Sequence, residues 1–391
     1  MSDEMASARV TALREHERTM PEPAERTSLD SRPPGWNEHW AEAWQEHRHD
    51  GLVPCRVTRI DKGGITVSTG PGDERLVIAA KAVRRVVVGD VCGLDAAAGR
   101  IESILPRITV FERRSPGVAR DQIELSSRAV ASNMDLVYVL QPLDPGVNPS
   151  RLARELVLAW ESGARPVVLL TKSDLVDDDE IARQRALATE NAPGVDVHVV
   201  SIRSDAGLDE LSSDHGPGHV IALLGASGAG KSTLVNALAG HHVQLVAEVR
   251  EHDGRGRHTT TAGQIIELSD GALLIDTPGI RGVGLWSADA GLEHAFEDLS
   301  PFAQQCRFGD CSHVDEPGCG IIDAVERGDL TAERVSLWRE LAAELDDLED
   351  GLEVRGREQR KQKNQRSKRK AARRDLRVDD NTGIDDDLDE E

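Results

Sequence analysis

The glycine-rich segment Gly225–Ser232 has the residue types and spacing of a phosphate-binding loop. It reads Gly-x4-Gly-Lys-Ser, follows an apolar run and precedes a segment with helical character. In such a loop the backbone N–H groups turn toward phosphates, the lysine bridges the β and γ phosphates, and the serine hydroxyl binds Mg²⁺. The flanking strand and helix favour this interpretation over a chance glycine-rich turn. The expected phosphate-binding residues are Gly225, Ala226, Ser227, Gly228, Ala229, Gly230, Lys231, Ser232 and Thr233.

A second apolar run ends in an Asp-Thr-Pro-Gly sequence that starts at Asp276 and ends at Gly279. Asp276 can hold a water bound to Mg²⁺, and the N–H of Gly279 can contact a γ-phosphate and release when that phosphate leaves. On its own, Asp-x-x-Gly is a common turn. Its place downstream of a phosphate loop favours the functional interpretation.

A third motif predicts preference for guanine over adenine. The carboxylate of Asp174 can accept hydrogen bonds from N1–H and from the amino group of guanine, whereas adenine offers no such pair of donors. Lys172 can lay its methylene stem over the base, and Thr171 stands where asparagine is commoner, which we expect to loosen the loop slightly. A weaker signal after the next strand suggests a backbone contact to the base oxygen. The expected base-binding residues are Thr171, Lys172, Ser173, Asp174, Ser201 and Ile202.

The order of these motifs indicates a circular permutation. The base-reading motif at Thr171 precedes the phosphate loop at Gly225, whereas an ordinary GTPase has the phosphate loop first. Domain termini usually lie at the surface and often close together, so a chain can be permuted without changing its sheet. In this order the stretch after Asp276 runs directly into the C-terminal part of the chain. A movement of this switch would therefore be passed through the backbone to the C-terminal part.

Between the phosphate loop and Asp276 lies the polar, glycine-rich segment Gly254–Thr261. It suits a mobile switch in which one threonine hydroxyl reaches Mg²⁺ when the γ-phosphate is present. We expect Thr260 to do so rather than Thr259. The alternative is a plain solvated loop.

Three cysteines and one histidine provide a full tetrahedral ligand set for a structural zinc ion. Their spacing is Cys-x4-Cys-x-His-x5-Cys, and the alternative is a group of reduced, metal-free thiols. The two other cysteines, Cys55 and Cys92, are expected to be small core residues. The expected zinc ligands are Cys306, Cys311, His313 and Cys319.

The elements that must position these residues follow from hydrophobic patterns. Short β-rich runs at 53–60, 64–68, 76–79, 86–88 and 100–105 predict a small barrel of OB type. From residue 133 strands and helices alternate, which predicts a mostly parallel sheet with ligands at the carboxyl ends of its strands. The fold class is thus multidomain α/β, ending in a zinc-binding helical domain whose last helix Thr331 can cap. The expected units are 1–50, a flexible extension; 51–108, the barrel; 109–300, the permuted α/β domain; 301–352, the zinc-binding domain; and 353–391, a basic and then acidic tail.

Composition and charge indicate where the protein acts and what it can bind. The 391 residues are 39% hydrophobic, and no apolar run resembles a signal peptide or reaches membrane-spanning length, so we expect a soluble cytoplasmic protein. The net charge of -22 argues against nucleic acid, yet the basic run Arg355–Arg374 makes the charge strongly asymmetric. In the first 50 residues, Trp36, Trp40 and Trp44 have the spacing of one helix face, which favours a short helix packed on its own domain.

The permuted motif order, the preceding barrel and the zinc pattern together resemble the RsgA (YjeQ) family of GTPases that depend on the small ribosomal subunit. The resemblance spans roughly 52–352 and includes the text Arg257–Thr261. It implies GTP/GDP, Mg²⁺ and one structural Zn²⁺ as cofactors, the 30S subunit and 16S rRNA as partners, a monomer, and a role in late 30S maturation. It also suggests His258 as the catalytic residue that helps to activate water.

Two other interpretations remain open. The protein could be a nucleotide-gated, rRNA-binding assembly scaffold whose hydrolysis is incidental. An ATP-dependent kinase is a third possibility, which the guanine-specific carboxylate of Asp174 and the lack of a recognisable acceptor site disfavour.

Overall fold

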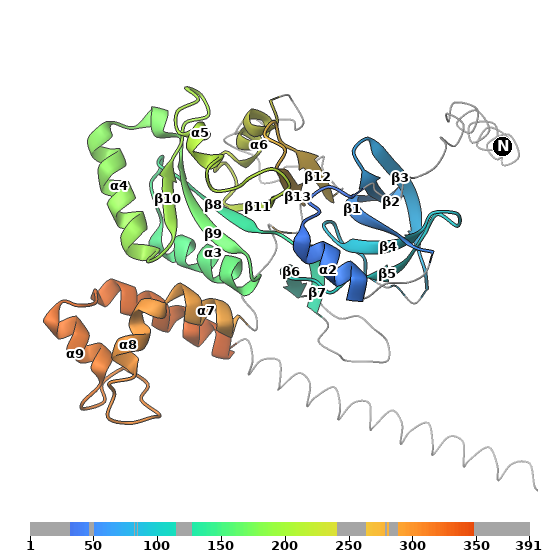
Figure 1. Ribbon diagram of the computed structural model, residues 1–391. Coiled ribbons are helices and arrows are strands. Elements are labelled where there is room, and N and C mark those ends of the chain that lie inside the picture. Colours follow the sequence, from blue (N-terminus) through green and yellow to red (C-terminus); the bar gives the residue numbers. More distant parts are fainter. Residues whose placement is uncertain are drawn as a thin grey trace, which may run out of the picture.

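The computed structural model describes residues 32–46, 51–81, 83, 85–114, 127–240, 263–277, 280 and 288–347 of the chain. Within these residues a β-barrel, an α/β domain and a helical region follow one another along the chain (Figure 1). No helix of this described part is long and apolar enough to cross a membrane.

The barrel closes because its first strand pairs with two others. Neighbouring strands follow the order β1-β2-β3-β5-β4, and β4 pairs again with β1. Cys55 and Cys92 face each other across the β1–β4 pair, and both are completely buried, which confirms that they are core residues. The five-stranded barrel was predicted from the sequence. Its strands are β1 (Val53–Asp61), β2 (Gly64–Gly70), β3 (Asp73–Ala79), β4 (Val91–Asp95) and β5 (Arg100–Ile104).

The predicted strand at Val86–Val88 is wrong. Only a single isolated bridge forms there, and the fourth barrel strand begins at Val91. The chain turns between the two because Gly89 adopts a φ of 95°, in the left-handed region that glycine favours. The buried carboxylate of Asp90 fixes this turn, since it accepts a backbone hydrogen bond from the same segment and pairs with Arg107 at 2.7 Å.

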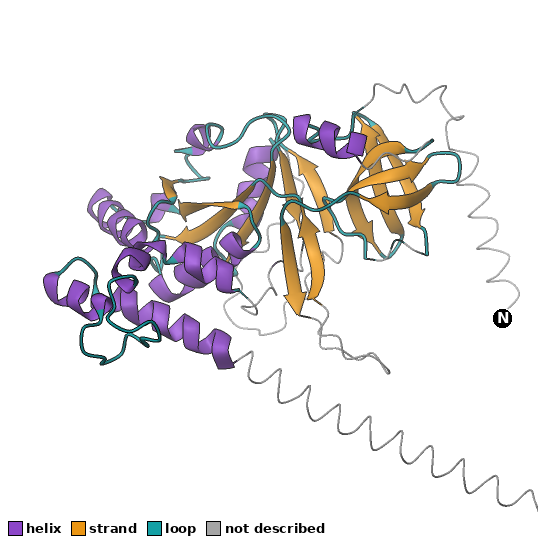
Figure 2. Ribbon diagram, turned by 60° about the horizontal axis from the view of Figure 1, so that its bottom comes forward, coloured by secondary structure: helices purple, strands orange, loops and turns teal. Residues whose placement is uncertain are grey.

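The α/β domain has helices on both faces of its sheet, as Figure 2 shows. Val137 and Val139 pack on the side of α3, whereas Leu136, Tyr138 and Leu140 pack on the side of α6. This alternation is what a strand buried on both faces requires. All strands run parallel except β12. The elements are α3 (Pro149–Glu161), α4 (Asp178–Asn191), α5 (Leu208–Leu211), α6 (Lys231–Ala239) and, in sheet order, β10 (Asp196–Val199), β9 (Arg165–Thr171), β8 (Leu136–Pro142), β11 (Val220–Gly225), β13 (Leu273–Asp276) and β12 (Gly263–Glu267).

One strand is shared between the barrel and the α/β domain. β12 pairs with β13 on one side and with β1 on the other, where Arg59 lies opposite Gln264 and Ile60 opposite Gly263. The barrel strands and the α/β strands thereby form one continuous eleven-stranded sheet in the described residues. The sequence patterns did not predict β12 or this connection. A separate hairpin, also not predicted, consists of β6 (Val110–Arg114) and β7 (Ser127–Ser132).

The tryptophan-rich segment forms the helix α2 (Glu38–Glu46), which packs on the barrel. Trp40 is 2% exposed and lies in one cluster with Val91 and Leu105. The guanidinium of Arg56 lies 5.8 Å from the centre of the Trp40 ring. A helix packed on its own domain is therefore confirmed for these residues.

The C-terminal region contains α7 (Asp289–Ala295), η3 (Glu297–Leu299), α8 (Ser300–Ala303), α9 (Gly320–Arg327) and a helix over 332–347. The side chain of Thr331 accepts a hydrogen bond from the N–H of Arg334, as the predicted cap requires. Arg334 is 3% exposed and donates to the carbonyl oxygens of Asn191 and Ala295 and to the carboxylate of Asp298. A single buried guanidinium thus connects the helical region to the end of α4.

Candidate functional site

The phosphate-loop segment lies at the carboxyl end of β11, in the middle of the α/β strands. Gly225 has a φ of 143°, and a Cβ there would lie 2.9 Å from the carbonyl oxygen of Leu140, so this position requires glycine. Gly230, with a φ of 93°, directly precedes α6. Lys231 begins α6, and its Nζ donates to the carbonyl oxygens of Gly225 and Ala226 at 2.5 Å each. The segment therefore has the strand, turn and helix of a phosphate-binding loop.

The predicted base-reading segment is connected to this loop by a hydrogen bond from Thr171. Thr171 is the last residue of β9, and its buried hydroxyl donates to the carbonyl oxygen of Ala229 at 2.8 Å. The side chain of Ile202, from the segment after β10, lies within 3.8 Å of where a Cβ on Gly230 would be. Three loops that are distant in sequence thus meet at one edge of the sheet, as expected for the carboxyl ends of parallel strands.

The carboxylate of Asp174 is held in place from the next loop. Its Oδ1 accepts a hydrogen bond from the hydroxyl of Ser201 at 2.8 Å, and Arg203 lies 3.9 Å from Oδ2. Lys172, immediately before the short helix η1 (Ser173–Leu175), has a left-handed backbone with a φ of 63°. A fixed carboxylate that stays partly exposed can accept the paired hydrogen bonds of a guanine base.

Asp276 ends β13, which runs beside β11. Ile280, which follows the Asp-x-x-Gly sequence, is 3% exposed and belongs to the main core cluster, so its side chain cannot orient a water. The other predicted residues of this part, Gly279, His258, Thr259 and Thr260, lie outside the residues that the structure describes.

A polar pair beside the phosphate loop has no motif that would reveal it in the sequence. Gln141, next to Leu140 on β8, donates from Nε2 to Oε2 of Glu155 on α3 at 2.6 Å. Burial raises the pKa of Glu155 to about 7, opposed by the charges of Lys231 and Arg151 and by this hydrogen bond. Only the folded chain shows that an isolated helical glutamate lies within the electrostatic reach of the phosphate-loop lysine.

The four predicted zinc ligands come together in the loop between α8 and α9. Their ligand atoms all lie within 4.8 Å of one another. Nδ1 of His313 is 3.3 Å from Sγ of Cys306 and 3.4 Å from Sγ of Cys319, and the two sulfurs are 3.9 Å apart. Thiolates about 2.3 Å from a tetrahedral zinc ion lie about 3.8 Å from each other, so this donor set could hold zinc.

The surroundings of the cluster orient its ligands. The N–H of Gly320, at the start of α9, donates to Sγ of Cys306 at 3.3 Å. The ring of His313 meets Trp338 edge-on with 5.6 Å between ring centres, and the guanidinium of Arg339 donates to the His313 carbonyl. Support of this kind fixes the orientation of metal ligands.

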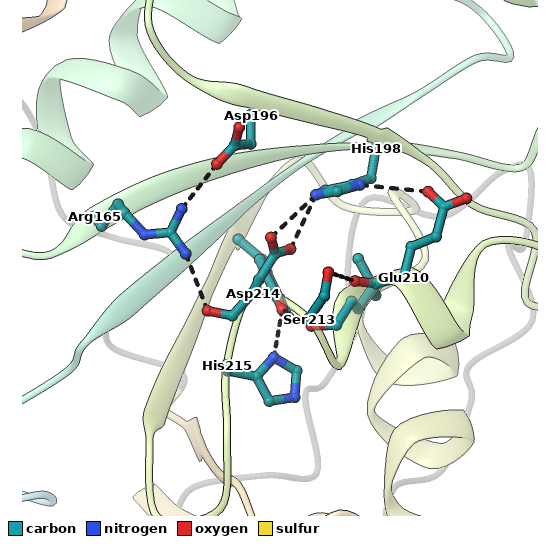
Figure 3. A network of polar contacts seen from close by, with 9 residues as sticks. Arg165, Asp196, His198, Glu210, Ser213, Asp214 and His215 are labelled. Carbon is teal, nitrogen blue, oxygen red and sulfur yellow. Dashed lines mark hydrogen bonds and ion pairs between the residues drawn. The ribbon is translucent and has the colours of Figure 1, made fainter.

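A second polar network, shown in Figure 3, lies toward the opposite end of the sheet from the phosphate loop. Arg165 and Asp196, the first residues of β9 and β10, pair at 2.9 Å, and His198 contacts Asp214 at 3.0 Å. The buried ring of His215 lies 2.7 Å from the hydroxyl of Tyr138. These contacts fix the chain segment that leads into β11, so the network supports the permuted connection and not the nucleotide site.

The order of the strands and motifs defines the class of protein. The base-reading loop after β9 precedes the phosphate loop after β11 in the chain, yet both lie at one edge of a parallel sheet. A five-stranded barrel precedes these loops in the chain and a Cys₃His group follows them. Together with the strand order, this is the arrangement of a circularly permuted P-loop GTPase.

Comparisons with known proteins specify the family. A family model described as RsgA GTPase matches residues 104–286. A Streptomyces coelicolor protein named small ribosomal subunit biogenesis GTPase RsgA is 39% identical over 317 residues, which cover 79% of this chain and 85% of that protein. A protein of the same name from Methanosarcina acetivorans is 37% identical, with 80% and 84% covered. The chain belongs to the RsgA family of GTPases.

Solved structures agree with this fold. The crystal structure of YjeQ from Thermotoga maritima matches with a TM-score of 0.58 and 25% identity, over 75% of this chain and 98% of that one. The structure of YloQ, described as a circularly permuted GTPase, matches with a TM-score of 0.54 and 20% identity, over 77% and 97%.

Proposed function

We propose that this protein is a GTP hydrolase that binds the small ribosomal subunit, acts late in 30S maturation and couples loss of the γ-phosphate to release. The observation that carries the proposal is the joining of the base-reading and phosphate loops by the Thr171 hydrogen bond, in a chain 39% identical to a small ribosomal subunit biogenesis GTPase. The relative's name supports the small subunit as partner.

The residues of the nucleotide site would act as follows. Asp174, held by Ser201, selects guanine through paired hydrogen bonds. The backbone N–H groups from Gly225 to Lys231 cradle the phosphates, and the lysine side chain turns from its carbonyl partners to the β and γ phosphates. When bound, Mg²⁺ neutralises the charge that develops on the transferred phosphoryl group. Ser232 offers the hydroxyl ligand and Asp276 holds a metal-bound water.

Release depends in this proposal on the segments beside the γ-phosphate. We propose that Gly279 contacts this phosphate, that Thr260 completes the Mg²⁺ ligands, and that His258 orients the attacking water. The side chain of Ile280 is buried and cannot orient the attacking water, so another residue must do so. The Cys₃His group would hold a structural zinc ion, because all four positions are filled by protein and none is open for catalysis.

The proposed RNA contacts lie outside the nucleotide site. A five-stranded barrel of this type often binds oligonucleotides, and the run Arg355–Arg374 carries eleven basic residues against one acidic residue. We propose that 16S rRNA is bound by these parts, that the protein acts as a cytoplasmic monomer, and that the units 51–108, 109–300 and 301–352 form the barrel, the GTPase domain and the zinc-binding domain.

The direct test is the rate of GTP hydrolysis with and without purified 30S subunits, with ATP as competitor. We expect strong stimulation by 30S subunits and no competition by ATP. A rate that 30S subunits leave unchanged, together with nucleotide-dependent 30S binding, would favour a scaffold whose hydrolysis is incidental. Effective competition by ATP would contradict the role of Asp174.

A further inference from the structure

A cavity lies between helix α2, barrel strand β1 and the first residues of the α/β strands. Its volume is about 360 Å³, which is within the range of small-molecule sites. Its lining includes Trp40 of α2, Arg56 of β1, and Leu136 and Arg165 at the starts of β8 and β9. The phosphate loop follows the other end of the parallel strand β11, so the cavity is separate from the proposed nucleotide site.

Arg56 is a buried cation in the wall of this cavity, and much of its hydrogen-bonding capacity is unused. The side chain is 1% exposed, and its Nη2 donates to the carbonyl oxygen of Gly35 at 3.2 Å. The guanidinium also lies 5.8 Å from the centre of the Trp40 ring. Within the described residues, Nε and Nη1 have no hydrogen-bond partner. These two nitrogens carry three N–H groups, one on Nε and two on Nη1.

The charge of Arg56 is not neutralised by these contacts. Burial lowers the pKa of Arg56 to about 10, against the opposing charge of Asp135, so the guanidinium is still cationic at neutral pH. The carbonyl of Gly35 and the ring of Trp40 are both neutral, whereas buried charges in proteins are normally paired with an opposite charge. Oδ2 of Asp135 accepts a hydrogen bond from the N–H of Val220 at 2.7 Å. The cavity wall thus carries a positive charge that a bound anion would compensate.

The other lining residues indicate which kind of anion fits. A planar carboxylate matches the N–H geometry of a guanidinium. Asp135 and Asp214 also line the cavity, and their carboxylates disfavour a ligand with a second negative charge. Ile108, which is 53% exposed, and Leu136 supply apolar surface beside these polar groups. A single carboxylate with a short aliphatic body suits this lining.

We propose that this cavity binds a small organic acid with a single negative charge, whose carboxylate is held by the guanidinium of Arg56. Since Arg56 is almost inaccessible, its guanidinium turns toward the cavity as the acid enters. The N–H groups of Nε and Nη1 then donate to the carboxylate, and the aliphatic part of the acid lies against Ile108. The bound acid contacts α2, the barrel and the α/β domain together. It requires no GTP, so this inference does not rest on the proposed function.

The test compares melting temperatures of the full chain in sodium isovalerate, sodium acetate and sodium phosphate at equal ionic strength. Isovalerate offers a carboxylate and a branched aliphatic body, acetate offers little more than the carboxylate, and phosphate carries a larger charge. Arg56→Met removes the charge and keeps most of the side-chain length. The matched control is Arg59→Met on the same strand, where the side chain is 53% exposed and pairs with Asp61. Phosphate also stabilises proteins through exclusion from their surface, and this contribution is shared by all variants.

We expect isovalerate, well above its dissociation constant, to raise the melting temperature of the unmodified protein and of Arg59→Met by about 2–5 °C. Acetate should raise it less. Arg56→Met should show only the general salt effect. Without isovalerate, Arg56→Met should melt at the same temperature as the unmodified protein or higher, because a buried unpaired charge has been removed.

The proposal would be overturned if isovalerate left the unmodified protein unchanged or stabilised Arg56→Met equally. A lower melting temperature of Arg56→Met with an unchanged response to isovalerate is the behaviour of a merely structural residue. If phosphate separated the unmodified protein from Arg56→Met as much as isovalerate does, an organic acid would be the wrong ligand class.

Arg56→Lys is the second variant, for the case that Arg56→Met does not fold. It keeps the positive charge but lacks the planar fork of N–H groups, so calorimetric titration should show about tenfold weaker binding of isovalerate. Unchanged affinity in Arg56→Lys would overturn the role of Arg56.

Discussion

In the proposed function, guanine selection depends on Asp174, and the position of its carboxylate is set by one short contact. The hydroxyl of Ser201 holds Oδ1 at 2.8 Å, so the carboxylate is already oriented. Replacing Asp174 by Asn turns a pair of acceptors into one acceptor and one donor. We expect GTP affinity to fall on the order of 10- to 100-fold and xanthine nucleotides to gain in part.

Titration with fluorescent GTP and xanthosine triphosphate measures this effect. The control is Asp178→Asn, four residues further on and exposed at the start of α4. Unchanged GTP affinity in Asp174→Asn would refute the base-reading role.

His258 is the second residue with a specific expectation, and it lies outside the described residues. A neutral imidazole can accept a hydrogen bond from water, and the buried Ile280 leaves that task to another residue. His258→Ala should bind GTP and 30S subunits almost normally and lose most of the stimulated rate, by about 100-fold or more. Single-turnover hydrolysis with 30S subunits measures this.

The matched control for that substitution is His252→Ala, which lies just before the segment Gly254–Thr261. Full stimulated turnover in His258→Ala would exclude this histidine from the mechanism.

At the residue scale, the sequence predicted what short motifs encode. The strand, turn and helix around Gly225 were predicted because residue type and spacing together fix the backbone there, as the φ of 143° at Gly225 illustrates. The environment of Glu155 was not predictable, since it is created by the folding of α3 against the preceding strand β8, where Gln141 donates to its carboxylate.

Among the elements, the loop between α8 and α9 is the one that we expect to depend most on a bound zinc ion. It contains little regular structure. The carboxylate of Glu316 accepts hydrogen bonds from the backbone N–H groups of Ser312 and Val314 at 2.9 Å, and the four predicted zinc ligands would supply the other connections. Removing zinc, or changing Cys311 to Ala, should destabilise the region from about 301 to 352 by several kcal/mol. GTP affinity should stay nearly unchanged.

Metal analysis and hydrogen exchange of this region provide the measurement, with the exposed neighbour Asp310→Asn as control. Freshly purified protein without zinc would contradict the prediction, and so would equal protection in the two variants.

Strands were predicted correctly where the local hydrophobic pattern determines them. They were missed where pairing with strands distant in sequence determines them. The runs that form β8, β9 and β11 are continuously apolar, and such a run indicates a strand that is buried on both faces. β12 is five residues long and is stabilised by pairing with β13 and β1, which no local pattern reveals.

At the scale of the whole molecule, the distribution of charge along the chain bears on RNA binding. The chain carries a net charge of -22, yet eleven basic residues gather within Arg355–Arg374. Deleting the residues after Leu352 should weaken 30S binding and flatten its salt dependence. The logarithmic slope should change by about 0.7 for each phosphate of single-stranded RNA that the shortened chain no longer neutralises.

Binding measured across a salt series tests this, with a deletion of only the acidic end 385–391 as control. Identical salt slopes for the full chain and the longer deletion would show that the basic run does not contact RNA.

The pairing of β1 with β12 has a consequence for the time course of synthesis. The barrel strands leave the ribosome early, whereas the partner of Arg59 and Ile60 is made roughly 200 residues later. At about 5–20 residues per second, this end of β1 waits on the order of 10–40 s for its partner. Unpaired strand edges invite aggregation, and charged side chains reduce that risk. The exposed ion pair between Arg59 and Asp61 lies at this edge, where it can protect the growing chain until β12 arrives.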